Sequence, residues 1–254
     1  GATGRKKVLR FEGHYHGWLD TIAWNPADPT ADLGPRAAPP FRASSRRQLS
    51  EDAANLVVRP WNDSALLQQT FAEHGESLAA LICDPFACAA GLIPADRAFL
   101  EEARRLCTPH GVVLIFDEVI TGFRVALGGA QAHYGVTPDC AVFAKALGNG
   151  YPVAALAGRA PLMDEFTRGI VHAGTYNSNS VSMAATRATL ETLIADDGAA
   201  LRQAHARGMR LMGGLEAMAA EVDLPLEVSG VGAVFSTRFP KVHGPRARDF
   251  RAAR

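Results

Sequence analysis

The sequence predicts an α/β protein built on a mostly parallel, doubly wound sheet with helices on both faces. Two runs rich in β-branched, aromatic and small apolar residues, 112–116 and 140–144, each lead directly into charged residues and are separated by a helical pattern. Such short runs are typical of parallel strands that are buried on both faces. Strand-like and helical runs alternate along most of the chain, and with right-handed crossovers this alternation gives a doubly wound layer.

The first part of the chain predicts two strands, an irregular segment and a helix. Residues 8–11 form a short apolar run suited to a strand. Residues 25–48 carry five prolines among Ala, Arg and Ser, which favours a long irregular segment. Asn62-Asp63-Ser64 precedes spaced apolar residues, the pattern of a capped helix. Residues 78–83 form the next strand and end at Asp84-Pro85.

The middle of the chain predicts a helix followed by three strands. Residues 97–107 have apolar positions at helical spacing, and Gly111 is placed to end that helix. The strands at 112–116 and 140–144 come next, with Gly128-Gly129 and a short polar helix between them. Residues 153–157 are expected to form a further strand.

The last part of the chain predicts two helices and the start of a second domain. Residues 180–195 and 199–222 repeat Ala, Met and Leu at helical spacing. Apolar and polar residues alternate weakly over residues 227–239, which also contain two glycines, and this is consistent with a single strand. We therefore expect a large domain over residues 1–222, and the beginning of a truncated C-terminal small domain over residues 223–254.

Composition and charge exclude several classes of partner. Apolar residues make up 48% of the chain and charged residues 20%, which is normal for a soluble protein with a substantial core. The formal net charge is zero, so nothing indicates nucleic acid or an anionic membrane as a partner. No apolar stretch approaches the length of a membrane span. The basic start of the chain lacks the apolar core of a signal peptide.

The cysteines and histidines indicate no metal site. The four cysteines lie in or beside apolar segments without CxxC spacing, which predicts reduced thiols and a cytoplasmic protein. The histidines show no metal-ligand spacing that acidic partners would support.

Lys145 and Asp117 are the strongest candidates for chemistry, because each follows a predicted strand. Carboxyl ends of parallel strands are where open α/β sheets bind ligands. The chain has four lysines against 22 arginines, and Lys145 alone is flanked by apolar residues, Phe143, Ala144, Ala146 and Leu147. An apolar setting lowers the pKa of an amine and makes it nucleophilic, as a Schiff-base lysine requires.

Each candidate has a structural alternative. Lys145 could be a lysine at a helix start that extends to solvent, and Asp117 could cap the turn after its strand. Apolar residues followed by Asp117-Glu118 also fit the Walker B strand of a nucleotide hydrolase. That interpretation requires Gly-x4-Gly-Lys-Ser/Thr, which does not occur in this chain.

Two motifs resemble the signature of a known family. Phe116-Asp-Glu-Val-Ile-Thr-Gly-Phe-Arg124 and Phe143-Ala-Lys-Ala-Leu-Gly-Asn-Gly-Tyr-Pro152 are similar to those of class III aminotransferases, pyridoxal 5'-phosphate (PLP) enzymes of fold type I. The similarity runs from about residue 3 to about residue 239. Within the family it is greatest to the branch of glutamate-1-semialdehyde aminomutase and the β-amino-acid aminotransferases. The fold class that the resemblance implies is the large domain of PLP fold type I.

The resemblance implies a role for several residues. Lys145 would bind PLP covalently and then act as the base on the α-carbon proton. Asp117 would accept a hydrogen bond from the pyridinium nitrogen, which keeps the ring an electron sink. Val119 would pack on one face of the ring and Tyr15 would stack on the other. His16 follows Tyr15 and is also expected at the cofactor, unless it is a hydrogen-bonded histidine of the turn.

Gly174 and Thr175 match a family segment that reaches a partner subunit. In the family the threonine hydroxyl contacts the phosphate of the partner's PLP, so the resemblance implies a homodimer with shared active sites. The alternative is that Thr175 forms a turn capping the helix at residue 180. The segment Thr-Tyr-Asn-Ser-Asn resembles the β-amino-acid aminotransferases, whereas Ile120, where many members have Gln, resembles the aminomutase branch.

The expected activity is PLP-dependent transfer of an amino group between an amino compound and a keto acid or aldehyde. One alternative is intramolecular amino transfer, as in glutamate-1-semialdehyde 2,1-aminomutase. Another is a non-catalytic domain, because Tyr15-His16-Gly17 comes so early that the family's N-terminal segment and phosphate-binding loop are expected to be missing. Asp84-Pro85 replaces the family's Glu-Pro, and Asp84 is expected to organise hydrogen bonds behind the site.

Overall fold

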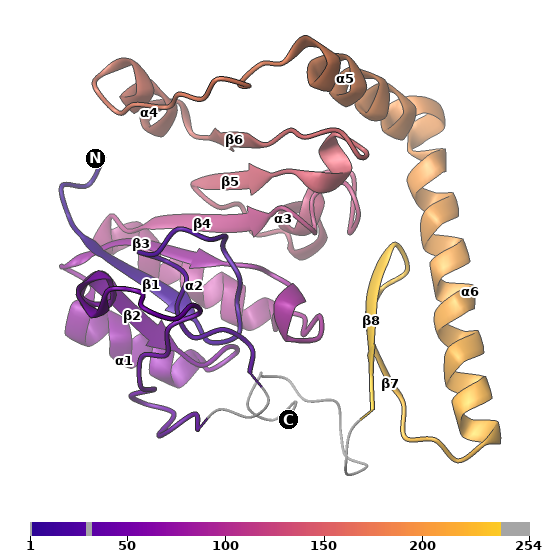
Figure 1. The fold of residues 1–254 in the computed structure, drawn as a ribbon, viewed down its shortest axis with the longest axis horizontal. Helices are drawn as coiled ribbons and strands as arrows, with labels where there is room; N and C mark the ends of the chain where they lie inside the picture. The colour runs from indigo at the N-terminus through magenta and orange to yellow at the C-terminus, as the bar shows by residue number, and fades with distance from the viewer. Residues whose placement is uncertain (1, 29–31, 240–254) are drawn as a thin grey trace.

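The sheet of this protein has six strands, five of them parallel. The computed structural model describes residues 2–28 and 32–239. The strand order is β2-β1-β3-β4-β5-β6, and within this six-stranded sheet, as described, only β6 runs antiparallel to its neighbour (Figure 1). The strands are β1 Lys7–Phe11, β2 Leu56–Arg59, β3 Leu78–Cys83, β4 Val113–Glu118, β5 Cys140–Phe143 and β6 Ala155–Gly158.

The helices follow the predicted pattern closely. They are α1 Ser64–His74, α2 Arg97–His110, α3 Gly129–Tyr134, α4 Ala160–Met163, α5 Ser180–Ile194 and α6 Ala199–Glu221. Short 3-10 turns cover Ser50–Asn55, Cys88–Ala90, Lys145–Leu147, Asp164–Thr167 and Ala195–Asp197. Asp63 caps α1 by accepting a bond from the Leu66 N–H, and Gly111 ends α2 with a left-handed φ of 58°. No described helix combines the length and apolarity that crossing a bilayer requires.

The main core lies on one side of β4, because alternate side chains of a strand point to opposite faces. Leu114, Phe116 and Glu118 are buried, whereas Val113, Ile115 and Asp117 are half-buried. Leu114 and Phe116 belong to the core cluster with residues of α1 and α2, including Phe71, Phe99 and Leu100. The other face of β4 is therefore the face that is left to build a site.

The predicted sheet is confirmed, with three differences in detail. The strand β2 was not predicted, since a four-residue run before Pro60 is too short to show a clear period. The segment predicted at 153–157 is β6, which begins two residues later and is antiparallel to β5. In addition, Asp117 and Glu118 are the last two residues of β4 rather than the residues after it.

The prediction of a single strand over residues 227–239 is wrong, because this segment is a hairpin. β7 Glu227–Val231 pairs antiparallel with β8 Val234–Arg238, and the hairpin lies alongside α6 (Figure 1). The division at residue 223 stays a prediction, and residues 240–254 of that second segment lie outside the described residues.

Two glycines allow the hairpin turn to touch the backbone of α6. A Cβ added at Gly208 would lie 1.6 Å from the carbonyl oxygen of Gly232, and one added at Gly232 would lie 2.3 Å from the oxygen of His205. Because both partners are backbone atoms, neither clash can be relieved by rotating a side chain.

We expect Gly208→Ala to lower the free energy of unfolding by about 1–3 kcal/mol, the usual cost of overpacking. Gly213→Ala in the same helix is the control, since nothing lies within 4 Å of its added Cβ. That variant should gain up to about 1 kcal/mol from helix propensity. Urea unfolding of both variants measures the difference, and equal behaviour would mean that the hairpin does not dock on α6.

Candidate active site

A hollow of about 320 Å³ lies at the carboxyl ends of the parallel strands. Ile82, Asp117 and Val142 come from the half-buried face of β3, β4 and β5 and line it together. The strand register places Asp117 beside Val142. The loops after the strands supply the other lining residues, namely Tyr15, His16, Gly17, Asp84, Cys88, Ala89, Val119, Ile120 and Lys145. We call this hollow the strand-end pocket.

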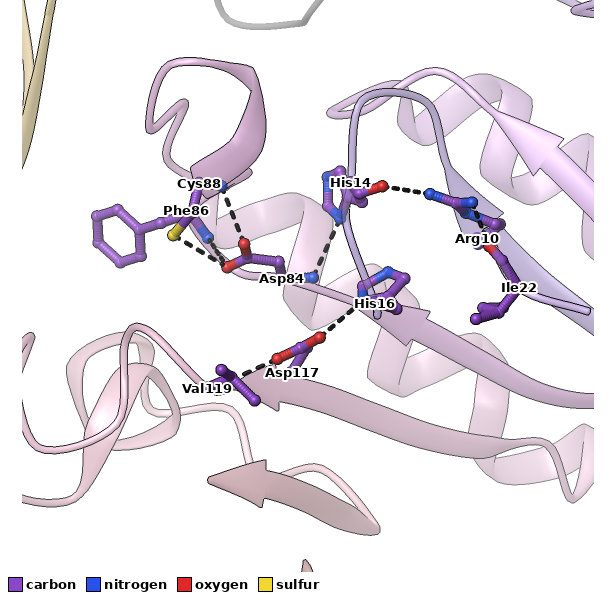
Figure 2. A network of polar contacts seen from close by, with 9 residues as sticks. All are labelled: Arg10, His14, His16, Ile22, Asp84, Phe86, Cys88, Asp117 and Val119. Atoms are coloured by element: carbon purple, nitrogen blue, oxygen red, sulfur yellow. Dashed lines mark hydrogen bonds and ion pairs between the residues drawn. The ribbon is translucent and has the colours of Figure 1, made fainter. Parts of the chain in front are cut away.

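Asp117 is held in place by two hydrogen bonds. Its Oδ2 lies 2.8 Å from Nδ1 of His16, whose side chain is 2% exposed. Its Oδ1 accepts a bond of 3.1 Å from the Val119 N–H. Figure 2 shows His16, on the loop after β1, and Asp117, at the end of β4, pointing toward each other. Because a carboxylate can only accept, Nδ1 of His16 carries the proton.

A second histidine, His14, makes a hydrogen bond to the residue after β3. The Asp84 N–H donates to Nδ1 of His14 at 3.1 Å, and the carboxylate of Asp84 accepts from the N–H groups of Phe86 and Cys88 (Figure 2). Burial raises the pKa of Asp84 to about 6 despite these bonds. The prediction that Asp84 organises hydrogen bonds is confirmed, but Asp84 lines the strand-end pocket rather than lying behind it.

Burial also keeps both histidines neutral. Desolvation lowers the pKa of His14 well below 6.5, helped by His16 and Arg10. Desolvation lowers the pKa of His16 too, although its bond to Asp117 opposes the shift. Within the described residues, the Nε2 atoms of both rings are buried without a hydrogen-bond partner.

We expect acidification below about pH 6.5 to destabilise the protein through His14. The folded state keeps this ring neutral while the unfolded chain binds a proton, so the stability present above pH 6.5 is lost as pH falls. One such group accounts for up to about 1.4 kcal/mol per pH unit. Urea unfolding at pH 7.5 and 5.5 measures the loss of unfolding free energy between the two pH values. This loss should be smaller by about 1 kcal/mol in His14→Gln than in the wild-type protein, and the amide oxygen of the variant can still accept from the Asp84 N–H.

The pH dependence of stability that Asp84 contributes has the opposite sign to that of His14. Its raised pKa means that protonation below about pH 6 favours the folded state. This contribution is common to the wild-type protein and His14→Gln, so it cancels in their comparison. The same pH dependence in both proteins would contradict the assignment to His14.

Glu118 faces away from the strand-end pocket and holds the scaffold. Its carboxylate is fully buried and accepts bonds from Thr121 Oγ1, from the Ala130 N–H and from two donors of Gln131. A Cβ at Gly129 would lie 2.3 Å from this carboxylate. The two adjacent acids therefore have different roles. Asp117 lines the pocket, whereas Glu118 binds donors in the segment after β4 and at the start of α3.

Lys145 borders the strand-end pocket, but its setting differs from the prediction. The apolar neighbours in sequence suggested a desolvated amine, whereas the residue is exposed although Leu147 is buried. The sequence could not show this, because the exposure of a side chain depends on the fold around it: Phe143, Ala144 and Ala146 are themselves only half-buried. Lys145 has a φ of +48°, a conformation that costs energy outside glycine and clusters at functional sites.

The two predicted ring contacts differ in how firmly they are held. Val119 is fixed by its bond to Asp117. Tyr15 is 48% exposed and meets Trp18 edge-on, with ring centroids 6.1 Å apart. Both line the strand-end pocket, so of the predicted site residues the structure brings together Tyr15, His16, Asp117, Val119 and Lys145.

Gly174 and Thr175 do not reach the strand-end pocket. They lie exposed in a turn before α5, where the Asn177 N–H donates to the Gly174 oxygen at 3.0 Å. Thr175 is not the cap of α5 either, because Asn179 accepts from the N–H groups of Val181 and Ser182. The capping alternative for Thr175 is therefore wrong.

Some pocket residues were not predicted. Strand alternation and register could have identified Ile82 and Val142, since each lies on the same sheet face as Asp117. No sequence signal identified Cys88, which reaches the pocket through the turn that Asp84 organises. Among the described residues there is no group of three or more His, Cys, Asp or Glu that could hold a metal ion.

Comparison with known proteins places these features in a family. The family model for class-III aminotransferases matches residues 1–250. The glutamate-1-semialdehyde 2,1-aminomutase of Rhodopirellula baltica (strain DSM 10527 / NCIMB 13988 / SH1) is 39% identical over 241 residues, which are 94% of this chain and 53% of that protein.

Two solved structures have the same fold. An omega-transaminase from Sphaerobacter thermophilus superposes with a TM-score of 0.89 at 32% identity, covering 99% of this chain and 57% of that one. The FumI protein of Sphingopyxis sp. MTA144, solved in a PLP internal aldimine form, superposes with a TM-score of 0.80 at 29% identity, covering 94% of this chain and 53% of that one.

The chain thus spans about half the length of the relatives that it matches. Their similarity confirms the predicted fold, the large domain of PLP fold type I. By its motifs, its fold and the match over nearly its whole length, the chain belongs to the class III aminotransferase family.

Proposed function

We propose that this protein uses PLP to transfer an amino group between an amino compound and a keto acid or aldehyde. The observation that carries the proposal is the meeting of Lys145 and Asp117 in one pocket at the strand ends. An amine just after β5 and a half-buried carboxylate at the end of the neighbouring strand β4 match the two groups that PLP needs from its enzyme. Family membership supports the same activity.

The residues of the strand-end pocket fit PLP. Asp117 offers a carboxylate that is 13% exposed and fixed by His16, suited to a protonated ring nitrogen. Val119 and Tyr15 offer surfaces for the two faces of a flat ring, and Ile82 and Val142 give an apolar floor. Lys145 lies at the same pocket with an exposed amine able to bond covalently to the PLP aldehyde.

Bound PLP would supply an electron sink for the bond changes at the amine-bearing carbon of the substrate. Lys145 Nζ then acts as the base that takes the proton from that carbon and returns it during transfer. Asp117 holds the proton on the ring nitrogen, because a carboxylate favours a neighbouring cation. His16 keeps Asp117 oriented by donating from Nδ1.

An external acceptor separates aminotransferase from aminomutase. The 39% identity to an aminomutase favours intramolecular transfer as the second candidate. Incubating the purified protein with PLP, an amine donor and pyruvate should produce alanine if the proposal holds. Conversion of glutamate-1-semialdehyde without any acceptor, and no alanine, would establish the aminomutase instead. A protein that neither binds PLP nor converts either substrate would be non-catalytic.

We further propose that the working unit is a cytoplasmic homodimer with shared active sites. The four cysteines are free thiols, which supports a reducing compartment. Gly174 and Thr175 are exposed and away from their own pocket, so they are available to a partner subunit. In an isologous dimer each Thr175 would serve the other subunit's cofactor.

Subunit mixing tests this arrangement. Thr175→Ala should weaken PLP binding by about 1–3 kcal/mol through a lost hydrogen bond to a charged group. Mixed with Lys145→Ala, it should form a heterodimer with one doubly defective site and one intact site, so activity at limiting PLP should partly return. No recovery after verified subunit exchange would refute the shared site.

A further inference from the structure

Arg124 is a half-buried cation close to Lys145 that the proposed chemistry does not use. Its Nη1 donates to the Ile120 oxygen at 2.9 Å, and within the described residues it forms no ion pair with a carboxylate. Burial lowers the pKa of its guanidinium, and the opposing electrostatic effect comes from Cys88 rather than from a carboxylate. A partly desolvated charge without a counter-ion is costly unless a ligand supplies one.

Arg124 borders two hollows, and Lys145 borders both of them. One hollow, of about 390 Å³, lies between Ile120 and the tip of the β7–β8 hairpin, where Val234 and Phe235 form an apolar wall. The other, of about 530 Å³, is lined by residues 150–153. Among the described residues, neither Nε nor Nη2 of Arg124 is buried without a hydrogen-bond partner, so these donors are open to an incoming molecule.

The charges around Lys145 determine what such a molecule can carry. Asp84 and Asp117 occupy the strand-end pocket and repel an anion there. Arg124 does not line the strand-end pocket but lines the two other hollows that Lys145 borders, and it presents a planar fork of donors, the geometry that pairs with a carboxylate. A substrate reacting at Lys145 would therefore turn its carboxylate toward Arg124 and away from the two acids.

We propose that Arg124 binds the carboxylate of the substrate, in the hollow between Ile120 and the hairpin tip, so that the substrates are amino and keto acids rather than simple amines. The proposal rests on the amino-transfer function proposed above. Val234 and Phe235 would contact the apolar part of the substrate beyond its carboxylate. Arg124 is thus a specificity-determining residue.

Binding of propionate and propionamide tests the proposal without turnover. The two molecules have the same shape and differ in charge. In the PLP-loaded protein, Arg124→Gln should weaken propionate binding by at least about tenfold, the expected loss of charged hydrogen bonds. Propionamide binding should change less than about twofold. Arg124→Lys should recover part of the loss, and Arg187→Gln, a control arginine exposed on α5, should leave binding unchanged.

Kinetics with a matched donor pair extend the test. Alanine and isopropylamine differ only in that a carboxylate replaces a methyl group. Arg124→Gln should raise the KM for alanine at least about tenfold, with a smaller effect on kcat, and should leave isopropylamine nearly unaffected where it reacts. Unchanged propionate binding and alanine KM would overturn the proposal while alanine formation still supported amino transfer.

The affinity for PLP distinguishes the second source of an anion, the cofactor's phosphate. It should stay within about twofold in Arg124→Gln. A tenfold loss of PLP affinity with normal propionate binding would assign Arg124 to the phosphate and would overturn the proposal. Absence of amino transfer in the wild-type protein with any donor would instead count against the proposed function.

Discussion

Lys145→Ala should remove the covalent attachment of PLP and lower amino transfer by at least about a thousandfold. The general-base role alone accounts for about 10²- to 10⁴-fold, and loss of the bond to the cofactor adds to it. Lys145 alone among the described lysines borders the strand-end pocket. Borohydride reduction followed by peptide mass mapping locates the attachment, and turnover with saturating PLP measures the kinetic loss.

Lys6→Ala is the matched control, because Lys6 lies at the start of the chain and lines none of the pockets described above. It should retain both the attachment and the activity. A reducible PLP adduct that persists in Lys145→Ala would move the reactive amine to another lysine. No adduct in the wild-type protein would favour the non-catalytic alternative.

The sequence was sufficient for those parts of the site that depend on strand periodicity. Asp117 and Glu118 end β4 on opposite faces, so a period of two already separates a pocket acid from a scaffold acid. The order of apolar runs predicted β3, β4 and β5 with their bounds nearly correct. The parallel pairing then placed their carboxyl ends together.

Contacts between parts of the chain that are far apart in sequence could not be derived in the same way. His16 and Asp117 are 101 positions apart, and nothing in the spacing of either shows that their side chains meet. The exposure of Lys145 likewise depends on how its neighbours pack. The hairpin was missed because Gly230 and Gly232 interrupt a weak alternation, and the packing of the turn against the backbone of α6 at Gly208 cannot be seen in the sequence.

Arg124 shows what a motif leaves out. It closes the Phe116–Arg124 motif by sequence, yet its position next to two hollows depends on the loop after β4 and on the hairpin tip. Thr175 shows the converse, since the resemblance gives it a role that its own subunit offers no site for. The roles of both residues therefore have to be tested by experiment, because the sequence pattern alone does not determine them.

Asp117→Asn should leave PLP bound through Lys145 but reduce turnover by about a thousandfold. The amide has no negative charge to hold the proton on the ring nitrogen, so the ring withdraws electrons less well. A loss of about 4–5 kcal/mol of transition-state stabilisation corresponds to a factor of roughly 10³. Retained PLP is measured by absorbance and reduction, and turnover by alanine formation from pyruvate. The bond from the Val119 N–H to the side-chain oxygen can persist in the variant.

Glu118→Gln gives the decisive comparison, because it removes one charge from the adjacent residue on the opposite face. Glu118 accepts four bonds in the scaffold, so this variant should lose about 1–3 kcal/mol of stability. Its turnover should stay within a few-fold of the wild-type value at a temperature where it is folded. Near-normal turnover in Asp117→Asn would refute the role at the ring nitrogen. Equal losses in the two variants would mean that strand packing, rather than the proton held by Asp117, controls activity.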